Sequence, residues 1–137
     1  RPRSENEVFW YLKKKNCSKK IIQRIIEKLK KNKLLGDEDF ADWWIEQRLT
    51  FKPRGRRALK NELYKKGLSR KLINRKIAEI SEKELKKAAE KVVEKRNYKW
   101  KKLKKLEQKK KIYAYLSRRG FNYSVINSII ENYLQSE

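Results

Sequence analysis

The architecture of this chain follows from residues 49–69, LTFKPRGRRALKNELYKKGLS. The stretch holds the end of one helix, a basic loop interrupted by Pro53 and Gly55, a complete short helix and the turn into another helix. Gly67 fits the position just after a helix end, where left-handed backbone is needed. Ser69 fits the cap of the helix that follows. The pattern predicts two short helices joined by a tight turn.

The second half of this stretch belongs to a pattern that occurs three times, about fifty residues apart. Each copy has a leucine, a turn residue four positions later, a capping residue six positions later, and then aliphatic residues at helical spacing. The leucines are Leu12, Leu63 and Leu116, the turn residues are Asn16, Gly67 and Gly120, and the capping residues are Ser18, Ser69 and Asn122. Such spacing is the signature of tandem units that bury their apolar faces against one another.

Capping residues also place the starts of two other helices. Ser4 with Glu7, and Ser81 with Glu84, have the spacing of a capping box. We expect the helix that opens at Ser81 to break somewhere in 97–105. No Pro or Gly marks this break, so one long unbroken helix is the alternative.

Apolar residues at a spacing near 3.6 predict which helix faces are buried. In the first helix we expect Val8, Tyr11 and Leu12 to face the interior. In the helix that opens at Asp37, we expect Phe51 to lie on the same side as Phe40. Pro53 and Gly55 then end that helix.

The sequence therefore predicts an all-α fold of about eight helices in tandem three-helix repeats, elongated and curved. Repeat 1 is expected to span 1–35 and to lack its first helix, repeat 2 to span 36–80, and repeat 3 to span 81–137, all within one continuous domain. Two prolines and four glycines in 137 residues argue against a β-rich fold.

The net charge of the chain limits the kinds of molecule that it is expected to bind. Forty Lys and Arg residues against seventeen Asp and Glu give a net charge of +23. A chain this basic attracts polyanions, namely nucleic acid, anionic lipid or an acidic protein surface. The alternative is that long cationic side chains simply solvate the outer faces of the helices.

Several kinds of chemistry are disfavoured. The absence of histidine removes His-based acid–base catalysis, Ser-His and Cys-His nucleophiles and the common zinc sites. The single cysteine, Cys17, has no internal disulfide partner, which fits a reducing compartment. No apolar run approaches the roughly 18 residues that span a bilayer. We expect no enzyme activity, no cofactor, no metal and no membrane insertion, and we expect the cytoplasm as the location.

Four stretches carry a likeness to a known family. They are 1–5 (RPRSE) leading into Glu7, 34–41 (LLGDEDFA), 52–55 (KPRG) running into 59–69, and 112–121 (IYAYLSRRGF). In this order and spacing, the sequence resembles RecX, a family of regulatory proteins that modulate the RecA recombinase. The resemblance covers essentially the whole chain, and it implies tandem three-helix repeats.

The resemblance also implies a function. RecX-like proteins bind the RecA filament on DNA, settle into its helical groove, and inhibit ATP hydrolysis and strand exchange. The expected partners are therefore the RecA filament and the single-stranded DNA within it, and the expected processes are DNA repair, homologous recombination and the SOS response. We expect a monomer. The alternative function is a stand-alone basic module that binds single-stranded DNA or RNA.

The basic loop and its flanks are the predicted binding surface. The residues expected to contact the filament or DNA phosphate are Arg48, Lys52, Arg54, Arg56, Arg57 and Lys60. Arginine suits this role because its planar guanidinium binds carboxylate or phosphate through two hydrogen bonds. The competing interpretation is that Pro53 and Gly55 only shape the connection and that the arginines are solvated.

Two further sets of residues have open interpretations. The aromatic residues are Trp43, Trp44, Tyr98 and Trp100, for which packing is favoured over stacking on bases. The lysine runs at 101–105 and 109–111 are either phosphate contacts or solvated helix faces.

Overall fold

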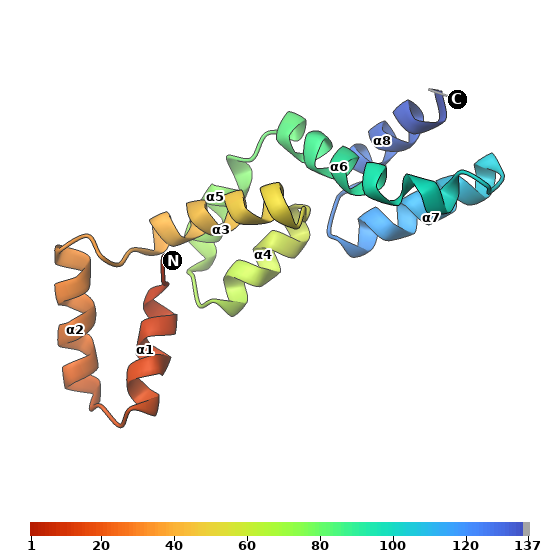
Figure 1. The fold of residues 1–137 in the computed structure, drawn as a ribbon. Coiled ribbons are helices and arrows are strands. Elements are labelled where there is room, and N and C mark those ends of the chain that lie inside the picture. The colour runs from red at the N-terminus through yellow and green to blue at the C-terminus, as the bar shows by residue number, and fades with distance from the viewer. Residues whose placement is uncertain (136–137) are drawn as a thin grey trace.

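The computed structural model describes residues 1–135, and within that range it contains eight α-helices and no strand. Figure 1 shows the helices as an elongated, curved row, with α1 and α2 at one end and α6, α7 and α8 at the other. The helices are α1 (Glu5–Lys14), α2 (Lys19–Lys31), α3 (Asp37–Phe51), α4 (Arg56–Lys65), α5 (Arg70–Ala78), α6 (Glu82–Trp100), α7 (Lys105–Arg118) and α8 (Tyr123–Gln135). The expected all-α fold of tandem helical units is confirmed.

The three predicted turns share one backbone geometry. Asn16, Gly67 and Gly120 have φ values of 63°, 84° and 89°. After each of them the next amide donates to the leucine carbonyl five residues back. These bonds are Cys17 to Leu12 at 3.2 Å, Leu68 to Leu63 at 3.3 Å, and Phe121 to Leu116 at 3.1 Å. This is the hydrogen bond of a Schellman motif, which ends a helix and reverses the chain.

The three predicted capping residues also act alike. The side chain of each one accepts a hydrogen bond from the backbone N–H three residues later. The pairs are Ser18 with Ile21, Ser69 with Leu72, and Asn122 with Val125, at 3.3, 3.2 and 3.0 Å. The turn and cap chemistry of the repeat is therefore confirmed. The repeat boundaries at 35/36 and 80/81 stay predictions, and both fall between helices.

One apolar core joins the helices from α3 to α8, which we call the body. Its buried members run along the chain from Phe40 to Ile130, with Leu59, Leu63 and Leu116 fully covered. Among the described residues, none from α1 or α2, which we call the N-terminal pair, belongs to this core. Ile22 and Leu35 are buried separately.

Two predictions of buried side chains were wrong. Tyr11 is 62% exposed, and no residue of α1 is buried, although Val8 and Leu12 are half-covered. Tyr11 lines an open hollow between α1 and the end of α4 instead of packing into a core. Phe51 is 67% exposed, because the end of α3 borders an open groove rather than the core.

The predicted break in the long helix is confirmed, since α6 ends at Trp100 and α7 begins at Lys105. Gln108 explains why no Pro or Gly is needed. Its buried side chain, which lies on α7, donates from Nε2 to the Trp100 carbonyl at 2.9 Å. A side chain from the following helix thus satisfies a carbonyl at the end of α6.

Candidate functional site

The predicted basic loop is fastened to the turn between α7 and α8. The Gly55 N–H donates to the Arg119 carbonyl at 2.9 Å, and Arg119 Nη1 donates to the Pro53 carbonyl at 3.2 Å. Pro53 itself is buried. Pro53 and Gly55 are therefore both held by Arg119, which lies more than sixty positions later.

Glycine is required where the two backbones meet. A Cβ on Gly55 would lie 2.3 Å from the carbonyl carbon and oxygen of Gly120. These are backbone atoms of a turn with positive φ, so they cannot move aside easily. This close approach holds the basic loop against α7.

Three of the six predicted binding residues are engaged in intramolecular contacts. Arg56 donates to the Ile80 carbonyl, and Arg57 donates to the Ser117 carbonyl. Arg48 pairs with the Glu62 carboxylate at 2.8 Å. These contacts connect α3 to α4, and they connect the start of α4 to the α5–α6 connection and to α7, so the three arginines hold the scaffold together.

The other three predicted residues lie on two different surfaces. Lys52 and Arg54 line a groove that α6 and α7 complete. Lys60 lines a separate hollow beside Tyr64 and Arg70. The structure thus brings Lys52 and Arg54 together and does not unite all six residues in one patch.

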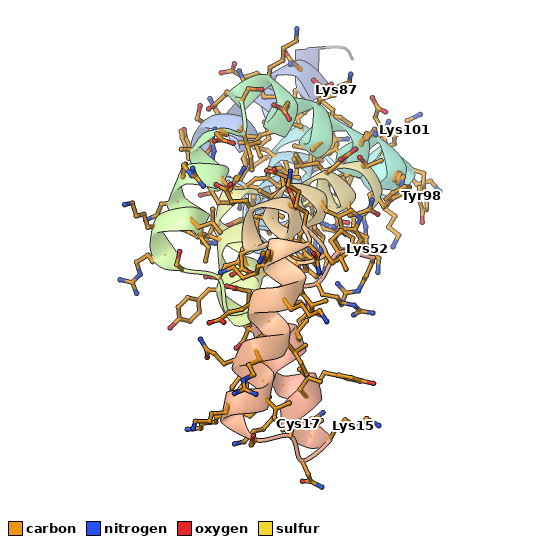
Figure 2. The ribbon with its side chains drawn as sticks, turned by 90° about the vertical axis from the view of Figure 1, so that its left-hand side faces the viewer. Lys15, Cys17, Lys52, Lys87, Tyr98 and Lys101 are labelled. Atoms are coloured by element: carbon orange, nitrogen blue, oxygen red, sulfur yellow. The ribbon has the colours of Figure 1, made fainter. Side chains whose placement is uncertain are left out.

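The groove beside Lys52 and Arg54, which we call the basic groove, has a volume of about 500 Å³. Its cationic lining residues are Lys52, Arg54, Lys91, Lys95, Arg96, Lys99 and Arg119, and its aromatic ones are Phe51, Tyr98 and Tyr115. Thr50, Pro53 and Val92 complete the lining, which includes no carboxylate. Figure 2 shows Lys52 and Tyr98 projecting outward on the same side of the molecule. A site with this lining attracts anions.

Tyr115 positions two of these cations. The guanidinium carbon of Arg96 lies 4.5 Å from the centre of the Tyr115 ring, and that of Arg119 lies 4.9 Å from it. Trp100 packs against the same ring in a T-shaped arrangement, with the centroids 5.8 Å apart. Cation–π contacts of this kind fix the guanidinium planes without neutralising their charge.

Sequence reasoning missed the part of the groove that α6 and α7 contribute. Lys91, Lys95 and Lys99 follow one another at four-residue spacing, which places them on one face of a helix. That spacing was a usable signal, whereas the contribution of Arg119 depends on the docking of the loop. The lysine runs at 101–105 and 109–111 do not line this groove.

The four aromatic residues singled out in the sequence differ in their exposure to solvent. Trp100 is buried, and Trp43 and Trp44 are half-buried against Phe40, with ring centroids 6.2 and 5.8 Å away. Tyr98 is 69% exposed at the edge of the basic groove. Only Tyr98 among the four remains largely open to solvent.

Within residues 1–135, no group of His, Cys, Asp or Glu side chains is arranged to hold a metal ion. In the same part of the chain, no helix combines the length and the apolar character that crossing a bilayer requires.

Comparison with known proteins gives a consistent result. A family model described as the second three-helix domain of RecX matches residues 37–76, and one described as the third three-helix domain matches residues 82–130. The first range contains the basic loop, and the second contains α6 and α7.

Relatives of similar sequence carry the name regulatory protein RecX. The one from Oceanobacillus iheyensis is 32% identical over 96% of this chain, and the one from Finegoldia magna is 34% identical over 93%. The chain spans about half the length of the first relative (48%) and 63% of the second. Both names describe regulatory proteins.

Solved structures agree on the fold. The crystal structure of RecX from Lactobacillus salivarius superposes with a TM-score of 0.86, at 23% identity, over 96% of this chain and 86% of that one. This likeness concerns the fold, and the family is established by the two domain models and the relatives. The chain belongs to the RecX family.

Proposed function

We propose that this chain regulates a RecA-type recombinase by binding its nucleoprotein filament and inhibiting ATP hydrolysis and strand exchange. Acting in the cytoplasm on filaments of single-stranded DNA, it would modulate DNA repair, homologous recombination and the SOS response. The observation that carries this proposal is membership of the RecX family across two successive three-helix domains. The relatives' name, regulatory protein, supports control of another protein rather than catalysis.

The physical properties of the molecule support the same partner. An elongated, curved row of helices presents a long surface, which suits contact with several subunits of a filament (Figure 1). The net charge of +23 favours a partner that carries DNA phosphate. Lys52 and Arg54 are our first choice for direct contact, because Arg48, Arg56 and Arg57 are engaged within the fold.

The test is ATP hydrolysis by preassembled recombinase filaments, with this protein added far below the nucleotide concentration. A fall in rate at such low ratios is expected, because a filament regulator acts without covering the DNA. A fall only near saturation of the DNA would contradict the proposal and would favour a simple nucleic-acid-binding protein.

Charge reversal tests the contact surface. Lys52→Glu combined with Arg54→Glu should weaken inhibition at least about tenfold, since both direct and long-range attraction are reversed. Lys83→Glu with Lys87→Glu is the control, because it makes the same change of charge on an exposed part of α6 outside the basic groove. Equal inhibition by the two variants, both with intact helical circular dichroism, would remove Lys52 and Arg54 from the contact surface.

A further inference from the structure

We propose that the basic groove binds a short segment of single-stranded nucleic acid, with phosphates on its cations and an unpaired base against Tyr98 or Phe51. The site combines the α3–α4 loop with α6 and α7, so it spans two of the helical units. The assignment rests on the proposed function for its setting, a filament that contains single-stranded DNA.

The first argument is the separation of charge on α6. Lys91, Lys95 and Lys99 lie on the groove side of this helix. Two carboxylates from the same part of this helix, Glu90 and Glu94, line a different hollow, formed with α8. The cations of the groove therefore face one another without a carboxylate in the lining, and their mutual repulsion is relieved when an anion binds.

The second argument is that two guanidinium groups are held in place before a ligand arrives. Arg96 and Arg119 rest on the Tyr115 ring, and Arg119 is also tied to the Pro53 carbonyl. The Nε atom of Arg54 is buried in the groove region and has no hydrogen-bond partner. Side chains fixed in this way lose little rotamer freedom on binding phosphate.

The third argument selects nucleic acid from other polyanions. Phe51 and Tyr98 line the groove with 67% and 69% of their surfaces exposed, so core packing does not account for their position. Aromatic rings beside a cationic track bind single strands by stacking on the bases, whatever the base sequence. A duplex keeps its bases paired and stacked, so it can use the cations but not the rings.

The experiment measures fluorescence anisotropy of a labelled oligothymidylate of about 12 nucleotides, a length within the range that such sites cover. The protein is used without any recombinase, at several salt concentrations. Failure of this binding would therefore count against the groove alone, and the ATP-hydrolysis test would still decide the proposed function.

The charge test uses Lys95→Glu with Lys99→Glu, and the control is again Lys83→Glu with Lys87→Glu on the same helix. The groove variant should lose at least about tenfold in affinity. The slope of log K against log salt concentration should become less steep by about 1.4, which is the contribution of two phosphate contacts to a single strand. The control should change affinity by less than about threefold. Equal losses in both variants would overturn the proposal, because they would show attraction by net charge alone.

The stacking test uses Tyr98→Ala, with Tyr64→Ala as its control because Tyr64 is 64% exposed and lies outside the groove. Tyr98→Ala should weaken oligothymidylate binding about fivefold or more and leave duplex binding unchanged. The control should change neither. Phe51→Ala is measured in parallel, and an unchanged affinity for the oligothymidylate in both Tyr98→Ala and Phe51→Ala would overturn the stacking assignment.

Competition decides between ligand classes. Neither an oligoglutamate peptide nor ATP, at matched ionic strength, should displace the oligothymidylate at comparable concentration. Displacement by the peptide would overturn the proposal in favour of an acidic protein partner. Displacement by ATP would overturn it in favour of a mononucleotide site.

Discussion

The N-terminal pair and the body are held by contacts of different kinds. The body shares one apolar core from α3 to α8, and its two three-helix units also meet backbone to backbone at Gly55 and Gly120. The N-terminal pair joins the body through polar groups. Ser4 Oγ donates to the Lys66 carbonyl at 3.1 Å, and the Glu5 N–H donates to Asp37 Oδ1 at 2.9 Å.

A chain of similar units can therefore have regions of unequal stability. The free energy gained by burying apolar surface is proportional to the buried area, so a large shared core is strongly stabilised. A few hydrogen bonds, each worth about 1 kcal/mol net, stabilise a junction much less. We therefore expect the N-terminal pair to open from the body more readily than the body unfolds.

The largest effect should come from a cavity in the body. Leu59 is fully buried in the shared core, so Leu59→Ala should lower the free energy of unfolding by about 2–5 kcal/mol. Urea unfolding followed by circular dichroism would measure the loss. Amide hydrogen exchange should speed up across all helices from α3 to α8, because the core they share is weakened.

Ile22→Ala is the matched change in the N-terminal pair, because Ile22 is buried on α2 but lies outside the shared core. It should speed exchange in α1 and α2 while leaving the body's unfolding midpoint unchanged. A fall in that midpoint as large as the one in Leu59→Ala would show that the two regions unfold as one unit.

Local chemistry explains why so much of the fold was predictable from sequence. The turns at Asn16, Gly67 and Gly120 depend on backbone conformation within a few residues. The caps at Ser18 and Ser69 likewise need only the next turn of helix. Burial is not local in this sense, so Tyr11 and Phe51 were misplaced although the helices that carry them were predicted correctly.

The candidate site was less predictable for the same reason. The loop that carries Lys52 and Arg54 was recognised from sequence, but its partners on α6 and α7 are set by the contact of Gly55 with Gly120. Nothing near Arg56 or Arg57 in sequence indicates that each donates to a distant carbonyl. The arginines of the basic loop therefore could not be distinguished from sequence, whereas in the structure Arg54 lines the groove and Arg56 and Arg57 bind distant backbone carbonyls.

A smaller effect is expected from cutting the polar junction at Ser4. This fully covered side chain accepts from the Glu7 N–H at 3.1 Å and donates to the Lys66 carbonyl. Ser4→Ala should destabilise docking of the N-terminal pair by about 1–2 kcal/mol, since a cap is lost and a carbonyl loses its partner. Amide exchange in α1 should accelerate, and exchange in the body should not change.

Ser18→Ala separates the cap from the junction. Ser18 caps α2 in the same way, but it is exposed and makes no contact with the body. This variant should loosen only the first turn of α2. If it undocks α1 as much as Ser4→Ala does, the hydrogen bond to Lys66 contributes nothing to the junction.

The smallest effect concerns the charge of Asp37 at the same junction. Burial is the main cause that raises the pKa of Asp37 above its ordinary value near 3.8. The hydrogen bond from the Glu5 backbone lowers this pKa, and the negative charge of the Glu5 side chain raises it further. An acid whose pKa is raised by docking favours the docked state when it is protonated. That stabilisation is fully present below the ordinary pKa and is lost as pH rises through the raised value. At neutral pH, ionised Asp37 therefore weakens docking of the N-terminal pair.

Asp37→Asn keeps an oxygen that can accept the Glu5 N–H but removes the buried charge, so docking should be stronger than in the unchanged protein at pH 7 and equal to it at low pH. The substitution also removes a carboxylate from the start of α3, where negative charge is favourable. Asp39→Asn measures that loss separately, because Asp39 is exposed in the same first turn. Exchange rates in α1 at neutral and acidic pH compare the two variants. Faster exchange in Asp37→Asn than in Asp39→Asn at pH 7 would mean that the charged hydrogen bond outweighs burial, and the sign of this prediction would reverse.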